Sequence, residues 1–87
     1  MSPDPEELHE EERRLRHLRI VVSLAMSVIA QSDLSRTEAE ALVAATRHTA
    51  LGLFPGKELA FDLIYLPRFR RLMAERWPPA RSTAERN

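Results

Sequence analysis

Acidic and histidine side chains are the first residues of this sequence to consider for chemistry, because they could bind a metal ion. The segment from His9 to Arg13 begins like the zinc-protease pattern H-E-x-x-H, but Arg13 stands where the second histidine is needed, and its charge would repel the metal. Glu6 and His9 form one Glu-x-x-His half-motif of a di-iron bundle, which requires a second one. Neither of the other two histidines follows a glutamate by three residues. We therefore predict no metal site, and without a glycine-rich phosphate loop we also predict no cofactor.

Nucleophilic and acid–base catalysis have equally weak support. The sequence contains no cysteine, so it offers neither a thiolate nucleophile nor a disulfide, and its serines lack a nearby histidine–acid pair. Asp62 is the one acidic residue well inside an apolar segment, between Phe61 and Leu63. We expect Asp62 to pair with an arginine such as Arg47 or with solvent. Burial beside Tyr65 would instead make it a candidate functional carboxylate. We predict that the protein is not an enzyme.

Arginine side chains near the C-terminus suggest a second chemistry, the binding of nucleic acid. The formal net charge is zero, so the protein as a whole is no polyelectrolyte, but residues 1–12 carry only acidic charges. In the C-terminal part, arginines interleave with Phe69 and Trp77 and could contact phosphates while the aromatic rings stack on bases. Nucleic-acid binding is therefore the alternative function, with candidate contacts at Arg68, Arg70, Arg71 and Arg76.

The longest apolar run, from Leu18 to Ala30, must carry the core. It is shorter than the roughly 20 residues that a bilayer span needs, and Arg16 and Arg19 stand at its start. No Gly or Pro interrupts the chain between Glu6 and Ala30, and apolar residues recur at helical spacing. The main stripe consists of Leu8, Leu15, Leu18, Val22, Ala25 and Ile29. A second stripe, which we expect to be buried from another side, consists of Val21, Leu24 and Val28.

Capping signals set the limits of the helices that must position these residues. Asp4 and the proline after it are typical of a helix start, and Glu7 could complete a capping box. Ser35 and Glu38 match the capping box again, with Leu34 before the cap as a hydrophobic staple on the next turn. Gly52 and the Phe-Pro-Gly turn after it end the second helix, and Trp-Pro-Pro at 77–79 ends the third.

The fold class that follows is all-α: a small three-helix bundle with helices at about 5–31, 36–53 and 57–77. Pro67 should kink or restart the third helix, because proline removes an amide donor and crowds the carbonyl of Leu63. We predict one domain at 1–77 and a disordered tail at 78–87. The acidic start does not resemble a signal peptide, so we expect a cytoplasmic protein.

The third helix is apolar over more than half of its circumference. One stripe, expected to face the core, consists of Leu59, Leu63, Leu66, Phe69, Met73 and Trp77. Two short neighbouring helices cannot cover the remaining apolar surface, which favours a homodimer. We therefore predict a helical protein–protein interaction or adaptor module that self-associates, without a membrane partner. The expected partner-binding residues are Leu8, Leu15, Phe61, Tyr65, Leu72 and Trp77.

Overall fold

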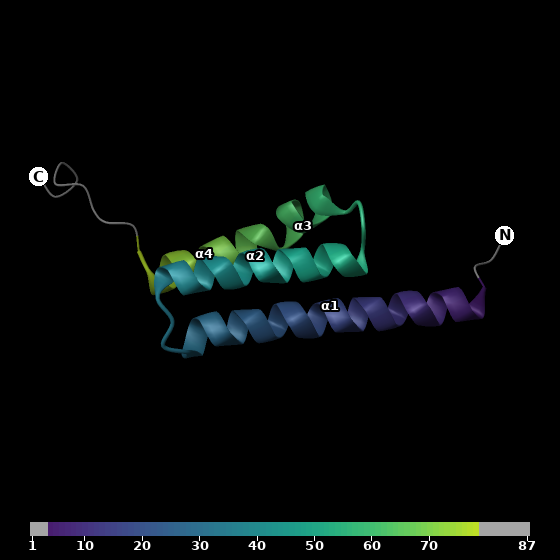
Figure 1. Cartoon of the computed structure of the whole chain (residues 1–87), viewed down its shortest axis with the longest axis horizontal. Coiled ribbons are helices and arrows are strands. Elements are labelled where there is room, and N and C mark those ends of the chain that lie inside the picture. The colour runs from purple at the N-terminus through teal and green to yellow at the C-terminus, as the bar shows by residue number, and fades with distance from the viewer. Residues whose placement is uncertain (1–3, 79–87) are drawn as a thin grey trace, which may run out of the picture.

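A computed structural model of the chain describes residues 4–78, and the tail predicted at 78–87 lies outside them except for its first residue. Four helices follow one another: α1 (Pro5–Gln31), α2 (Arg36–Leu53), α3 (Glu58–Ile64) and α4 (Leu66–Arg76) (Figure 1). The prediction of an all-α fold is confirmed for residues 4–78. The predicted count of three helices is not confirmed, because the third segment, expected to kink or restart near Pro67, forms two separate helices, α3 and α4, within the described residues. α2 runs back along α1, and α4 packs against both of them.

The helix starts follow the capping signals of the sequence. The Asp4 side chain accepts a hydrogen bond from the Glu6 N–H at 3.2 Å at the start of α1. At the start of α2 the capping box is complete: the Glu38 N–H donates to Ser35 Oγ at 3.1 Å, and the Ser35 N–H donates to Glu38 Oε1 at 2.9 Å. The hydrogen bond that the Ser35 backbone donates to the Glu38 carboxylate, followed by a contribution from the Ser35 side chain, lowers the pKa of Glu38. Leu34 packs against the core next to this cap, as expected for a hydrophobic staple.

The break between α3 and α4 lies at Tyr65, two residues before the proline that predicted it. Pro67 is the second residue of α4, where a missing N–H costs nothing. The N–H groups of Arg68 and Phe69 both donate to the Tyr65 carbonyl, at 3.0 and 3.1 Å. The predicted restart near Pro67 is therefore confirmed, and the new helix runs in a different direction from α3 (Figure 1).

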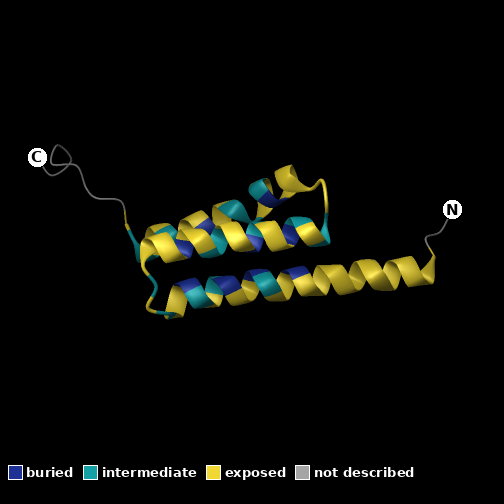
Figure 2. Cartoon of the chain, in the orientation of Figure 1, coloured by how far each residue is buried: buried dark blue, intermediate teal, exposed yellow. Residues whose placement is uncertain are grey.

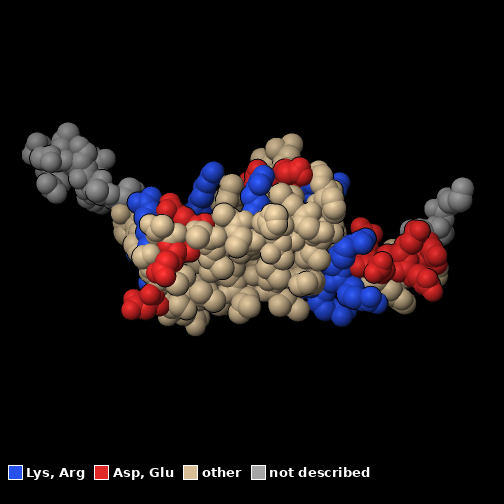
Figure 3. All heavy atoms as spheres, in the orientation of Figure 1, with Lys and Arg blue, Asp and Glu red and all other residues tan. Residues whose placement is uncertain are grey.

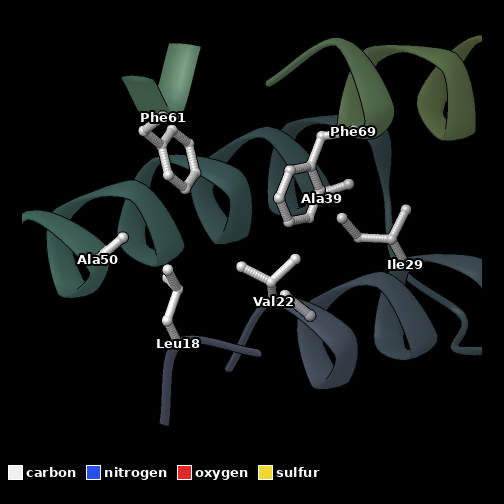
Figure 4. Close-up of a cluster of buried hydrophobic side chains, with 8 residues drawn as sticks. Leu18, Val22, Ile29, Ala39, Ala50, Phe61 and Phe69 are labelled. Carbon is white, nitrogen blue, oxygen red and sulfur yellow. The ribbon is translucent and has the colours of Figure 1, made fainter. Parts of the chain in front are cut away.

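The hydrophobic core lies between α1, α2 and the two C-terminal helices. Phe61 of α3 and Phe69 of α4 point from above towards Val22 of α1 (Figure 4). Many of the other core side chains are small, which lets the helices approach closely. The buried apolar residues are Leu18, Val22, Ala25, Ile29, Ala39, Ala50, Phe61 and Phe69.

The face of α3 that packs on the core is opposite to the predicted one. Phe61, expected on a partner surface, is only 4% exposed, whereas Leu59 and Leu63, expected in the core, are 72% and 68% exposed. In α4 the predicted stripe does face the core, and Phe69 is fully buried. The break at Tyr65 explains the difference, because a periodicity counted through the break assigns one common face to two helices that run in different directions.

The first part of α1 extends beyond the bundle (Figure 1). We call residues 5–16 the arm. All of its residues are exposed, including Leu8 and Leu15, and burial along α1 begins at Leu18 (Figure 2). The second apolar stripe of α1 is not buried as expected, because Leu24 is 62% exposed.

Candidate functional site

A cleft of about 750 Å³ lies between α1 and α4. Arg19 of α1 and Arg68 and Arg71 of α4 line it, together with one carboxylate, Glu75. Its apolar lining includes Val22, Met26 and Leu72, and its polar lining includes Ser23, Ser27 and Tyr65. The cleft therefore combines positive charge with an apolar surface, which suits an acidic, amphipathic ligand.

A second, mainly apolar pocket of about 320 Å³ adjoins the cleft. Leu15 of α1, Phe54 at the end of α2 and Ile64 of α3 are among its lining residues. Tyr65 lines both hollows, so they form one continuous surface along α1. We call this surface the cleft side of the molecule.

Four of the six predicted partner-binding residues line the cleft side. Leu15, Phe61 and Tyr65 line the pocket, and Tyr65 and Leu72 line the cleft. Phe61 belongs to the core and forms only a wall of the pocket, with its ring centroid 5.5 Å from that of Tyr65. The two remaining residues lie elsewhere: Leu8 on the arm, and Trp77 at the end of α4, half-buried against the core.

The four arginines predicted as nucleic-acid contacts do not form one patch. Arg68 and Arg71 line the cleft, whereas Arg70 does not. Arg76 has a structural role, because its guanidinium donates to the carbonyls of Ile29 and Ser32 at the end of α1. Carbonyl groups at the end of a helix have no hydrogen-bond donor within their own helix, so Arg76 caps the C-terminus of α1.

Asp62 pairs with Arg47, one of the two alternatives that the sequence left open. The Arg47 Nε donates to Asp62 Oδ1 at 2.8 Å, and the Arg47 Nη2 donates to Asp62 Oδ2 at 3.0 Å. The two side chains therefore form a bidentate ion pair between α2 and α3. The hydrogen bond from Arg47 lowers the pKa of Asp62, and it raises the pKa of Arg47. Because the carboxylate is about one-third exposed and already paired, it has the features of a structural group rather than a catalytic one.

Several exposed apolar side chains were not predicted as partner-binding residues. α3 presents Leu59, Leu63 and Ile64 to solvent, and α1 presents Ile20 and Leu24. A broad face without charged side chains extends over α1 and α2 (Figure 3). A shallow groove of about 240 Å³ lies between these two helices, and its lining includes Val21, Leu24, Val28, Leu42, Ala45 and Thr49. Within α1 the helical period alone places Ile20 and Leu24 away from the core stripe.

Charge is strongly separated along the arm. An acidic patch covers the start of α1 and a basic patch follows it (Figure 3). In this basic segment, Arg13 lies 3.9 Å from Glu10, and the Arg14 guanidinium lies 5.9 Å from the ring centroid of Phe54. The acidic residues are Asp4, Glu6, Glu7, Glu10, Glu11 and Glu12.

Comparisons of the chain with protein-family models, with curated proteins and with solved structures give no match. Within residues 4–78, no three histidine or acidic side chains are grouped so that they could hold a metal ion. None of the four helices is long and apolar enough to cross a bilayer, as far as the structure describes the chain.

Proposed function

We propose that this protein is a helical protein–protein interaction module that self-associates. The observation that carries the proposal is the number of large apolar side chains exposed in the single chain. Burying one such side chain at an interface would contribute about 1.5–3 kcal/mol. These exposed residues are Leu8, Leu15, Ile20, Leu24, Leu59, Leu63 and Ile64.

The modest core of the single chain supports the same proposal. Three of its eight buried apolar side chains are alanines, which bury little surface. Small domains without disulfides or metals commonly gain stability by association. A second copy would cover part of the apolar surface that the fold leaves in solvent.

Absolute mass measured by light scattering on a sizing column, over a series of protein concentrations and at low and high salt, tests the proposal. We expect a mass close to twice 10.0 kDa. A 10.0 kDa species at every concentration and salt level would overturn self-association.

Nucleic-acid binding is the second candidate, favoured by the arginines of the cleft. Arg68 and Arg71 stand with Arg19 around a concave surface that could follow a phosphate backbone. A mobility shift that weakens with salt, and that is lost when Arg70→Glu and Arg71→Glu are combined, would support this function. The single variant Arg70→Glu is the matched control, since Arg70 does not line the cleft. Absence of a shift by the wild type at low salt would exclude the candidate.

A further inference from the structure

We propose that the cleft between α1 and α4 receives the acidic arm of a second copy of this chain. The inference rests on the proposed self-association and specifies which surfaces form it. The cleft and the arm come from the same chain, so two copies related by a twofold axis would exchange arms and form both contacts at once.

Charge complementarity is the first argument for this occupant. The ion pairs within the described residues use Arg13, Arg36 and Arg47, which leaves the cleft arginines without a carboxylate in salt-bridge distance. The first part of the arm supplies the opposite charge. Together with Asp4, which precedes the arm, the residues up to Glu12 include six acidic side chains and no arginine or lysine, and the arm's three arginines follow at Arg13, Arg14 and Arg16. Bringing the two together would satisfy both groups of charges.

The periodicity of α1 is the second argument. Leu8, Glu12 and Arg19 are four and seven residues apart, so they share one face of the helix. Ser23 and Met26 continue this face, and Arg19, Ser23 and Met26 all line the cleft. The arm thus extends the cleft face of α1 beyond the bundle, where the chain's own helices do not cover it.

Helix length makes the two surfaces meet. α1 has 27 residues and a length of about 40 Å. If two copies of α1 pair antiparallel along this face, the first half of each helix lies beside the second half of the other. That second half borders the cleft, so Glu12 would approach the arginines and Leu8 would approach the apolar lining around Met26 and Leu72.

Charge reversal in two separate variants tests the arrangement. One variant carries Glu11→Lys and Glu12→Lys on the arm, and the other carries Arg68→Glu and Arg71→Glu in the cleft. Each alone should weaken the dimer at low salt by at least about tenfold, because like charges then face each other twice. An equimolar mixture of the two should dimerise again, since a basic arm then meets an acidic cleft and an acidic arm a basic one. Sedimentation equilibrium measures the dissociation constants, and circular dichroism checks that each variant remains helical.

Matched controls separate a specific contact from a change in net charge. Glu10→Lys reverses a charge on another side of the arm, and Arg70→Glu reverses one next to the cleft. Both should leave the dimer intact. If the control variants dissociate as the test variants do, or if the mixture stays monomeric, the arm–cleft contact is wrong.

The outcomes also separate this inference from the proposed function. A wild-type dimer that both reversed variants retain would overturn the arm–cleft contact, while self-association would stand and point to the uncharged face of α1 and α2. A wild-type monomer would overturn self-association, and the arm–cleft contact with it.

Discussion

Arg47 and Arg76 each join helices that are distant in the sequence. Arg47 of α2 binds both carboxylate oxygens of Asp62 in α3, and Arg76 of α4 donates to two carbonyls at the end of α1. Arginine suits both roles, because its planar guanidinium group presents several hydrogen-bond donors at once. The sequence groups Arg76 with the candidate nucleic-acid contacts, because nothing in its local sequence distinguishes a capping arginine from a solvated one.

Replacing Asp62 with Asn should lower the melting temperature by more at pH 7 than at pH 2. The Arg47 hydrogen bond lowers the pKa of Asp62 in the folded protein below its unfolded value. Its stabilising contribution is therefore complete above pH about 4 and is lost as the pH falls through the folded pKa. Thermal unfolding followed by circular dichroism at both pH values measures the difference.

Asp33→Asn is the control for this prediction, because Asp33 is exposed and lies in the turn between α1 and α2. It should melt as the wild type does at both pH values. An Asp62→Asn variant with the wild-type melting temperature at pH 7 would show that the ion pair does not stabilise the fold.

At the scale of the elements, the separation of α3 from α4 determines which residues are buried. α3 has seven residues, and Phe61 is its one buried side chain. A helix this short is marginal on its own, so α3 depends on the packing of Phe61 and on the ion pair of Asp62. The leucines that share the predicted stripe with α4 face solvent instead.

Phe61→Ala and Leu63→Ala should therefore differ strongly in stability. Removing the buried ring should cost about 3–5 kcal/mol, the usual range for phenylalanine in a core. Truncating the exposed leucine should change stability by less than about 0.5 kcal/mol. Urea unfolding at a fixed protein concentration measures both. If Leu63→Ala lowers the free energy of unfolding as much as Phe61→Ala or more, α3 packs on the core with the face predicted from the sequence.

At the scale of the whole molecule, the main features are the arm, which extends beyond the bundle, and the large apolar side chains that the fold leaves exposed. α1 is the longest helix, and the other three cover only its second part (Figure 2). The cleft side and the uncharged face of α1 and α2 are the two surfaces on which a second copy could complete the burial. Substitutions that place a charge on one surface or the other can distinguish them.

Tyr65→Glu or Leu72→Glu should break the dimer, while Leu24→Glu should leave it intact. Tyr65 and Leu72 line the cleft, whereas Leu24 lies on the uncharged face. A carboxylate in the cleft would repel the acidic arm. It would also be unfavourable next to the apolar side chains of the cleft. Light scattering gives the mass, and helicity shows whether each variant is folded. If both cleft variants remain dimeric and Leu24→Glu is monomeric, the interface lies on the uncharged face of α1 and α2 instead.

Local interactions explain how much of this protein could be read from its sequence. The caps at Asp4 and Ser35, the period of α1 and the break near Pro67 each depend on residues within about four positions, so the sequence determined where helices begin, end and restart. The pairing of Asp62 was also predictable, because a charge inside an apolar helix needs a partner.

Only the tertiary structure decided which face of α3 is buried, which carbonyls Arg76 binds and which residues line the cleft. These features depend on the direction in which the chain leaves the Phe-Pro-Gly turn and the break at Tyr65. Gly56 adopts a positive φ of 80° in that turn, and Tyr65 keeps a helical conformation at the break. Small differences in such backbone angles reorient a whole helix, and periodicity within one segment carries no information about them.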